Sequence, residues 1–343
     1  MNTKRRPSRN SVTIQDIARR AGVSTATVSR ALATPEQVSE RNRNKVMQAV
    51  AETGYTPNSL ARNLRVQRAM TILVIVPNVA NAFWPEVLRG IDDELVANRY
   101  DVIIGNIDNL VEREERYVNL AASGQVDGVL LMTGRTPISS DRSMADLDIP
   151  IVTIAAPIEE LNVPQVVVNE RAVSAEIAEH FLDLGHRRFG YIAGPENNIN
   201  ETERYSGFTD FLKRAGISDE NIIRWKGDFS FASGTSAGRQ FLRMNHRPTA
   251  VYAACDESAI SFLKTLNLGG VWVPRDVSVI GFDGIESGSF VEPTLTTVHQ
   301  PRAQMGRVAA KALLDSLAGL PVEPGLIELR APLVFADSTA PPS

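Results

Sequence analysis

Residues 12–32 have the sequence VTIQDIARRAGVSTATVSRAL, and this stretch decides the fold of the N-terminal part of the chain. Thr13 is suited to cap a short helix whose apolar residues recur at helical spacing. Gly22 is suited to end that helix, because glycine readily adopts the left-handed conformation that helix ends require. Ser24 can then cap a second helix over residues 25–32. The stretch therefore predicts two short helices joined by a tight turn.

The spacing of these signals is typical of a DNA-binding helix-turn-helix, in which the second helix enters the major groove. A third helix is predicted between Ser39 and Gly54. Arg30 is the strongest candidate for a bidentate contact with a guanine edge. The predicted base-facing residues are Thr25, Ala26, Thr27, Ser29 and Arg30, and Thr13 and Ser24 are predicted to hold phosphates. The alternative is an ordinary three-helix bundle in which Arg30 is a solvated charge.

Charge is distributed unevenly along the chain. Residues 1–70 contain 13 Lys/Arg and 4 Asp/Glu, a net charge of +9, whereas the remainder contains 23 basic and 36 acidic residues, a net charge of −13. A basic head on an acidic body is typical of a polyanion-binding module. A solvated basic tail is the alternative on charge alone. Residues 1–11 are basic and polar, and we predict a disordered arm.

Residues 57–68 follow the predicted helix-turn-helix domain (12–56) and are expected to form a hinge helix or linker. Pro57 suits the first turn of a helix, but only about two turns follow before the chain becomes polar again. So short a helix is marginal alone in water. It would form only when packed against something, such as a symmetry mate on DNA.

Residues 12–65 resemble the head and hinge of the lac repressor (LacI/GalR) family, through VTIQDIARRAGVSTATVSRAL and RNKVMQAVAETGYTPNSLARNLR. The resemblance implies that two hinge helices pair in the minor groove. Leu64 matches the residue that wedges a base step open and kinks the DNA. Ala61 matches the small residue that lets the paired helices approach. The hinge residues predicted to bind DNA are Asn58, Ala61 and Leu64.

From Thr71 onward, apolar β-branched runs alternate with amphipathic stretches of helical spacing. This pattern predicts parallel sheets covered by helices on both faces. Residues 69–340 are too many for one typical sheet, so two doubly wound lobes are expected. The predicted N-lobe spans about 70–165 and 295–325, and the predicted C-lobe spans about 166–294 and 326–338.

Segments such as ILVIVPNVANAFWPEVLRGI, LGHRRFGYIAGP and VPRDVSVIGFDGIE look like the periplasmic-binding-protein-like effector domain of the same family. The resemblance implies two lobes joined by three crossovers, with dimerisation and effector binding in this domain. Within the family, STATVSRAL, TILVIVP and GDFSF look similar to cytidine repressors. Dimerisation is expected through the lobe surfaces, including residues 83–97.

Ligands of such folds bind at the carboxyl ends of the strands. Aromatic side chains there would stack on a sugar or base, and Arg204 offers a fork of donors. The predicted effector-binding residues are Phe83, Trp84, Asn106, Asp108, Arg204, Phe229, Phe231, Asp256, Asp283 and Gln300. The effector is expected to be a nucleoside or a sugar. The alternative for each residue is a structural role, as a core aromatic or a helix cap.

Enzyme, metal and cofactor chemistry have little support in the sequence. Residues 234–238 (GTSAG) match a nucleophile elbow at Ser236, and Asp283 and His299 follow in triad order, but no buried strand leads directly into the motif. The four histidines show no metal-ligand spacing, and phosphate-binding glycine motifs are absent. We therefore predict no catalytic residues, no metal and no cofactor.

The predicted function is a repressor that binds double-stranded operator DNA as a homodimer or tetramer and is controlled by a small effector. A single cysteine, Cys255, excludes an intrachain disulfide and fits a reducing compartment. No secretory signal or membrane span is apparent, so a cytoplasmic location is expected, on the nucleoid when DNA is bound. The alternative is a soluble sugar- or nucleoside-binding or hydrolytic α/β protein with an incidental basic arm.

Overall fold

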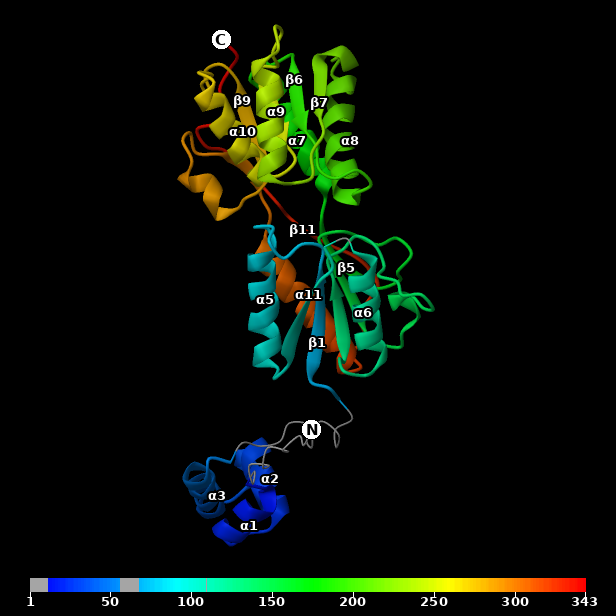
Figure 1. Ribbon diagram of the computed structural model, residues 1–343, viewed down its shortest axis with the longest axis vertical. Coiled ribbons are helices and arrows are strands. Elements are labelled where there is room, and N and C mark those ends of the chain that lie inside the picture. Colours follow the sequence, from blue (N-terminus) through cyan, green and yellow to red (C-terminus); the bar gives the residue numbers. More distant parts are fainter. Residues whose placement is uncertain (1–11, 56–67, 109) are drawn as a thin grey trace, which may run out of the picture. The chain divides into compact units, whose positions relative to one another are not determined.

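The computed structural model describes residues 12–55, 68–108 and 110–343. The chain divides into two compact units, Met1–Arg68 and Ala69–Ser343 (Figure 1). The predicted arm at 1–11 lies outside the described residues. So do the hinge residues Asn58, Ala61 and Leu64.

Within residues 12–55, the first unit contains three helices: α1 (Ile14–Ala21), α2 (Thr25–Ala33) and α3 (Glu40–Thr53), with a 3-10 turn, η1 (Pro35–Gln37), between the last two. Gly22 ends α1 with a φ of +67°, a conformation that costs glycine little. Ile17, Val28 and Val46, one from each helix, are fully buried against one another. The predicted three-helix head with its glycine turn is confirmed.

The first lobe of the second unit is a six-stranded parallel sheet in the order β11-β5-β4-β3-β1-β2. Its strands are β1 (Thr71–Val76), β2 (Asp101–Asn106), β3 (Gly128–Leu131), β4 (Ile151–Ile154), β5 (Pro164–Val168) and β11 (Gly325–Leu329). Its helices are α5 (Trp84–Ala97), α6 (Val111–Ala122) and α11 (Arg302–Leu317), with a 3-10 turn η2 (Met144–Asp146).

Side chains of the central strand β1 alternate between two helical layers. Ile72 and Val74 pack in one core with α5 and α11, whereas Leu73 and Ile75 pack in another with α6. Because successive side chains of a strand point to opposite faces, this sheet is covered by helices on both sides. Nearly every residue of β1 is buried for that reason.

The second lobe repeats this plan with the strand order β12-β10-β9-β8-β6-β7, all parallel except β12. Helices α7 and α8 cover one face, around Tyr191, and α9 and α10 cover the other, around Ile192. The strands are β6 (Phe189–Ile192), β7 (Ile222–Trp225), β8 (Ala250–Ala253), β9 (Ser278–Asp283), β10 (Thr296–His299) and β12 (Leu333–Val334). The helices are α7 (Glu170–Asp183), α8 (Ile199–Arg214), α9 (Phe231–Leu242) and α10 (Asp256–Leu268), with the 3-10 turns η3 (Asp219–Asn221) and η4 (Glu286–Phe290). Two doubly wound lobes were predicted, and this fold class is confirmed.

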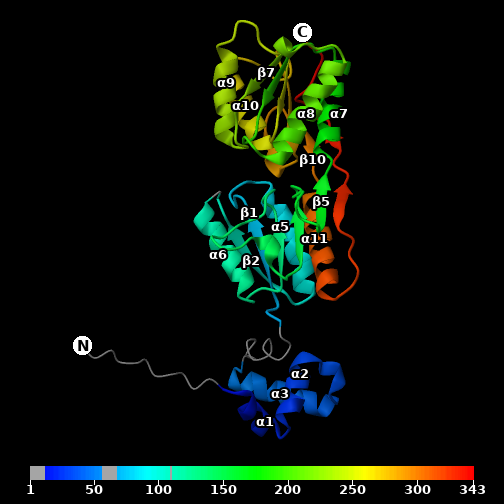
Figure 2. The same cartoon turned by 90° about the vertical axis from the view of Figure 1, so that its right-hand side faces the viewer.

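The lobe boundaries lie a few residues from their expected positions near 165, 295 and 325. Strand β5 continues to Val168 in the first sheet, β10 belongs to the second sheet, and β11 belongs to the first sheet as far as Leu329. Figure 2 shows β5 and the red strand beside it at the edge of the first sheet. The sequence did not place these boundaries because a buried apolar strand has the same pattern whichever sheet it joins.

Helices α5 and α11 approach so closely that backbone meets backbone. A Cβ added at Gly306 of α11 would overlap the carbonyl oxygen of Val87 in α5. We therefore expect Gly306→Ala to lower the unfolding free energy of the second unit by about 1–3 kcal/mol or more, as overpacking does. Scanning calorimetry of the full chain measures the shift of that transition.

Gly288→Ala is the matched control, because a Cβ there meets nothing nearer than 3.6 Å. It should leave the unfolding free energy unchanged or raise it by up to about 1 kcal/mol, because alanine restricts the unfolded chain more than glycine does. Equal effects of the two substitutions would show that α5 and α11 can move apart at little cost in free energy.

Candidate functional site

The helix-turn-helix of the first unit is held by two side-chain caps at positions predicted to contact phosphates. The Asp16 amide donates to Thr13 Oγ1 at 3.3 Å, and the Thr13 amide donates to Asp16 Oδ2 at 3.0 Å, which completes a capping box. The Thr27 amide donates to Ser24 Oγ at 3.1 Å. The caps fix both helix starts, so the backbone amides there are presented at defined positions.

Helix α2 has one buried and one exposed face. Val28 and Ala31 face the core, whereas Thr25, Ala26 and Arg30 are exposed and Thr27 and Ser29 are half-buried. The basic residues of α1 are paired, Arg19 with Asp16 and Arg20 with Glu52. Within the described residues Arg30 has no such carboxylate partner. The predicted base-facing residues therefore share one surface. The guanidinium of Arg30 on that surface is available for contact with DNA.

A buried arginine lies at the centre of the predicted effector site. Helix α8 begins at Ile199, so Arg204 lies in its second turn. Its Nε and Nη2 donate to the two carboxylate oxygens of Glu170 at 2.7 and 3.2 Å. Its Nη1 donates to the carbonyl oxygen of Ala254 at 2.5 Å. The guanidinium carbon lies 3.8 Å from the centroid of the Phe282 ring.

Asp283 and Gln300 belong to the same group. Asp283 Oδ1 lies 3.7 Å from Arg204 Nη2 and accepts a hydrogen bond from Gln300 Nε2 at 2.9 Å. Burial raises the pKa of Asp283 to about 7, against the lowering effect of Arg204. Near neutral pH this carboxyl can both accept and donate, which suits recognition of a hydroxyl group.

Of the seven non-glycine residues with a positive φ in the described part of the chain, two lie beside this guanidinium. Asp283 has a φ of +118° and Phe229 a φ of +62°, values that non-glycine residues rarely adopt and that cost about 1–3 kcal/mol each. The Phe229 ring centroid lies 5.5 Å from the Arg204 guanidinium carbon. Gly194 leaves room for that ring, since a Cβ there would overlap it. Strain of this kind is typical of binding sites.

A second buried arginine joins this group to the first lobe. Arg302 Nη2 donates to the carbonyl oxygen of Gly284 at 2.7 Å, and Nη1 to that of Ala82 at 3.4 Å. Its Nη2 also lies 3.2 Å from Glu86 Oε2. The Ala82 amide donates to Glu257 Oε1 of the second lobe at 2.9 Å. Arg302 thus connects the segment that precedes α5 with Gly284, the residue that follows Asp283.

Phe83 and Trp84 immediately follow Ala82. Both are buried, and their rings meet edge to face with centroids 4.8 Å apart. They pack into the core as well as lying next to the contact between the lobes. This leaves little of either ring exposed for stacking in this arrangement of the lobes.

Two buried polar atoms beside this group have no partner within the described residues. They are Gln300 Oε1 and Arg302 Nε. Leaving a buried polar atom unpaired costs about 1–3 kcal/mol. Such atoms are therefore candidates for contact with a bound molecule.

Four predicted effector residues do not join the group around Arg204. Asn106 Oδ1 accepts from the Val79 amide at 3.2 Å, and exposed Asp108 pairs with Arg113. Phe231, the first residue of α9, is exposed. Asp256 is fully buried, and both of its carboxyl oxygens have internal partners, Thr297 Oγ1 and the Ile285 amide. Burial, followed by the nearby Asp283, raises the Asp256 pKa to about 8.

Glu170 and Arg302 were not predicted, although a signal for Glu170 was available. Glu170 comes two residues after β5, just as Asp256 and Asp283 come at or just after strand ends. Arg302 follows β10 by three residues. The rule that selected strand-end residues would have found Glu170 had it been applied to β5 as well.

The nucleophile-elbow pattern at Ser236 is not an elbow. Ser236 lies inside α9, is exposed, and accepts a hydrogen bond from Gln240. The preceding strand, β7, ends at Trp225, well before the helix begins. Across residues 12–55, 68–108 and 110–343, no cluster of metal-ligating side chains occurs, and no helix is both long and apolar enough to span a bilayer.

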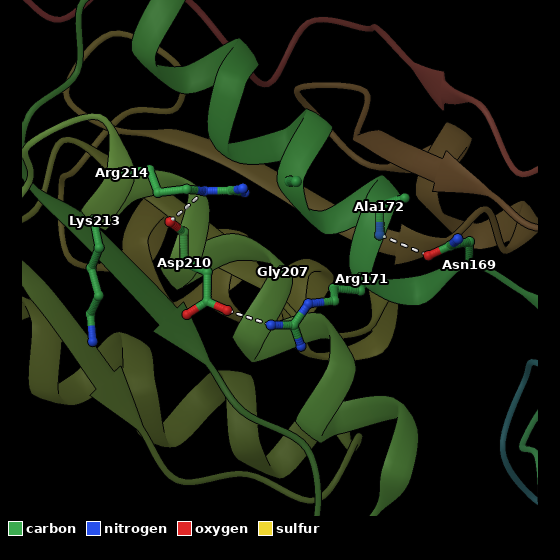
Figure 3. A pocket seen from close by; sticks show the side chains of 8 residues that line it. Asn169, Arg171, Ala172, Gly207, Asp210, Lys213 and Arg214 are labelled. Atoms are coloured by element: carbon green, nitrogen blue, oxygen red, sulfur yellow. Dashed lines mark hydrogen bonds and ion pairs between the residues drawn. The ribbon is translucent and has the colours of Figure 1, made fainter.

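A surface hollow lies elsewhere on the second lobe, between α7 and α8 (Figure 3). Arg171 points toward Asp210 across it, and Asn169 caps α7 by accepting from the Ala172 amide at 3.0 Å. The two helices approach closely at Gly207, where a Cβ would overlap the Arg171 carbonyl oxygen. None of the predicted effector residues lines this hollow.

Comparison with known proteins finds one family match in each of the two units. Residues 13–58 match the family described as bacterial regulatory proteins, lacI family, and residues 178–339 match the periplasmic binding protein-like domain. The HTH-type transcriptional repressor CytR of Escherichia coli K12 is 35% identical over 336 residues, covering 98% of each chain. PurR of Photobacterium profundum is 32% identical, covering 95% of this chain and 98% of its own.

Among solved structures, the lac repressor dimer bound to operator and the anti-inducer ONPF has a TM-score of 0.83 at 26% identity. It covers 96% of this chain and 100% of its own. A LacI family regulator from Enterococcus faecium with bound ribose has a TM-score of 0.73 at 27% identity, covering 80% and 100%. With relatives matched along nearly its whole length and a family head at its N-terminus, this chain belongs to the lacI family of bacterial regulatory proteins.

Proposed function

We propose that this protein is a homodimeric repressor whose affinity for operator DNA is set by a small effector, a nucleoside or a sugar, bound between its two lobes. The observation that carries the DNA-binding part is the exposed face of α2, where Arg30 lies among small residues and has no carboxylate partner within the described part of the chain. The named relatives are repressors rather than enzymes, and we propose no catalytic activity. Its place of action is the cytoplasm, on the nucleoid when bound to DNA.

The proposed DNA contacts divide into two kinds. Arg30 would read a guanine edge, with Thr25, Ala26, Thr27 and Ser29 beside it in the major groove. Thr13, Ser24 and the amides of the capped helix starts would hold phosphates. The hinge residues Asn58, Ala61 and Leu64 would bind and bend the centre of the operator. With so few base-reading side chains, bending would supply much of the sequence preference.

The proposed effector contacts are Arg204, Phe229, Asp283 and Gln300, with Phe83 and Trp84 on the side of the first lobe. Strained backbone at two of these residues and the unpaired Gln300 Oε1 support the choice. A structure related at 27% identity contains ribose, which agrees with hydroxyl recognition. An effector that prefers one arrangement of the lobes would shift the population of the DNA-binding form.

Arg30→Ala tests the docking of α2. Loss of a bidentate base contact should weaken binding to a selected operator about tenfold to a hundredfold and relax base preference at one position. Selection from random palindromic duplexes, followed by fluorescence anisotropy on the selected site, measures both quantities. Arg239→Ala, which removes an exposed arginine from α9, is the control and should bind like the wild type. Unchanged base preference in Arg30→Ala would disprove this docking.

Leu64→Ala tests the bending contact. If Leu64 opens a base step, the variant should lose affinity for the selected operator while keeping its affinity for random duplex, which depends on phosphate contacts. Anisotropy titrations on both duplexes at the same salt concentration measure the ratio of the two affinities. An equal loss on both would indicate a misfolded head rather than a lost wedge.

Asp283→Asn tests the effector site. Nucleosides and sugars that raise the melting temperature of the full chain identify the effector class. A hydrogen bond to a charged group contributes about 1.5–3 kcal/mol and one to a neutral group about 0.5–1.5 kcal/mol, so Asp283→Asn should weaken the binding of such a compound about fivefold to tenfold. Asp108→Asn removes an exposed strand-end carboxylate outside the group and should respond like the wild type. The reverse pattern would place the effector near Asp108.

A further inference from the structure

Glu170, which was not among the predicted effector residues, lies against Arg204 and affects the charge that a ligand would meet there. A guanidinium is a planar fork of donors that matches a phosphate or carboxylate in two-point contact. An unpaired Arg204 at the strand ends would therefore attract an anion strongly, because buried charges interact in a low dielectric.

In this protein the fork is already occupied. The edge formed by Nε and Nη2 contacts both oxygens of Glu170, and Nη1 contacts the Ala254 carbonyl. Phe282 lies against the guanidinium at 3.8 Å. Glu170 and Arg204 are each less than a tenth exposed. An anionic ligand would have to displace an internal carboxylate from this edge.

The neighbouring charges leave no positive surplus. Arg302 lies within 3.2 Å of Glu86, and Asp283 adds a further carboxyl 3.7 Å from Arg204. Two buried atoms here lack a partner within the described residues: Gln300 Oε1 can only accept a hydrogen bond, and Arg302 Nε can only donate one. A hydroxyl group can both donate and accept, so it can satisfy both atoms, whereas a phosphate dianion can only accept and leaves Gln300 Oε1 unpaired.

We propose that Glu170 selects the charge of the effector: by occupying the Arg204 fork, it makes the site accept an uncharged, hydroxyl-bearing ligand and reject the phosphorylated form of the same ligand. The proposal rests on the proposed effector site and adds its selectivity. Glu170 acts through Arg204, and Glu170→Gln, which keeps the size of the side chain but removes its charge, would open the site to anions.

The experiment uses the full chain and matched probes: ribose with ribose 5-phosphate, cytidine with cytidine 5′-monophosphate, and inorganic phosphate alone. Thermal-shift titrations give the affinity of each probe for the wild type and for Glu170→Gln. We expect the wild type to prefer the uncharged member of a pair. Glu170→Gln should gain at least about tenfold in affinity for a phosphate-bearing probe, the scale of one charge-assisted contact.

Glu203→Gln is the matched control, because Glu203 lies one residue before Arg204 on α8 but pairs with Arg171 at 3.6 Å. It should keep the selectivity of the wild type. In the double variant Glu170→Gln/Arg204→Gln the gained anion affinity should disappear, because the gain belongs to Arg204. If Glu170→Gln does not fold, Glu170→Asn, which leaves a space at the fork, takes its place.

Two results overturn the proposal: a wild type that binds a phosphorylated probe as tightly as its uncharged partner, or a Glu170 variant that gains no affinity for any anion. Failure of the effector site itself gives a different result. In that case the uncharged probes that stabilise the wild type would stabilise Asp283→Asn to the same extent.

Discussion

The burial of the Arg204 guanidinium constrains much of the second lobe. A charge removed from water is tolerated only when its donors find well-placed acceptors, and removal of one partner of a buried pair is costly. The partners of Arg204 come from the start of α7, the end of β8 and the end of β9. Helices α7 and α8 and strands β8 and β9 must therefore keep their relative positions. This fixes the positions of the side chains that an effector would contact.

Arg302 extends the same constraint toward the first lobe. It contacts the carbonyl oxygens of Gly284 and Ala82 with one guanidinium. Because Gly284 follows Asp283 directly, a ligand that moves Asp283 also disturbs the contact of Arg302 with the segment before α5. Arg204 and Arg302 thus form a short physical connection from the proposed effector site to the first lobe. If an effector binds as proposed, such a connection would couple its binding to the arrangement of the lobes.

The parts of this fold that local signals control could be predicted from the sequence. The head was predictable because Thr13, Gly22 and Ser24 act on their own helices, and capping depends on residues only a few positions away. The alternation of strands and helices was predictable because the spacing of apolar residues is also a local property of the sequence. The ends of the lobes were not, because β10 and β11 carry no sign of which sheet they join.

The candidate site was predictable only in part, because it depends on which strand ends meet. Arg204, Asp283 and Gln300 come together. In the other sheet, Asn106 ends the edge strand β2 and contacts Val79 after β1, and Asp108 pairs with Arg113 of α6. Glu170 follows a strand and could have been selected on that ground, but its pairing with Arg204, 34 residues away, could not have been predicted. No periodicity marks a pair of this kind.

The separation of charge along the chain complements these two sites. The basic N-terminal region carries +9 and the rest −13, so a polyanion is attracted to the head and repelled by the acidic remainder. The acidic remainder also disfavours anionic small molecules near its surface. Glu170 places the same preference inside the protein, where low dielectric makes one carboxylate more effective than many at the surface. Charge would then distinguish the two sites: phosphate groups of DNA would bind at the head, and phosphorylated small molecules would be excluded from the proposed effector site.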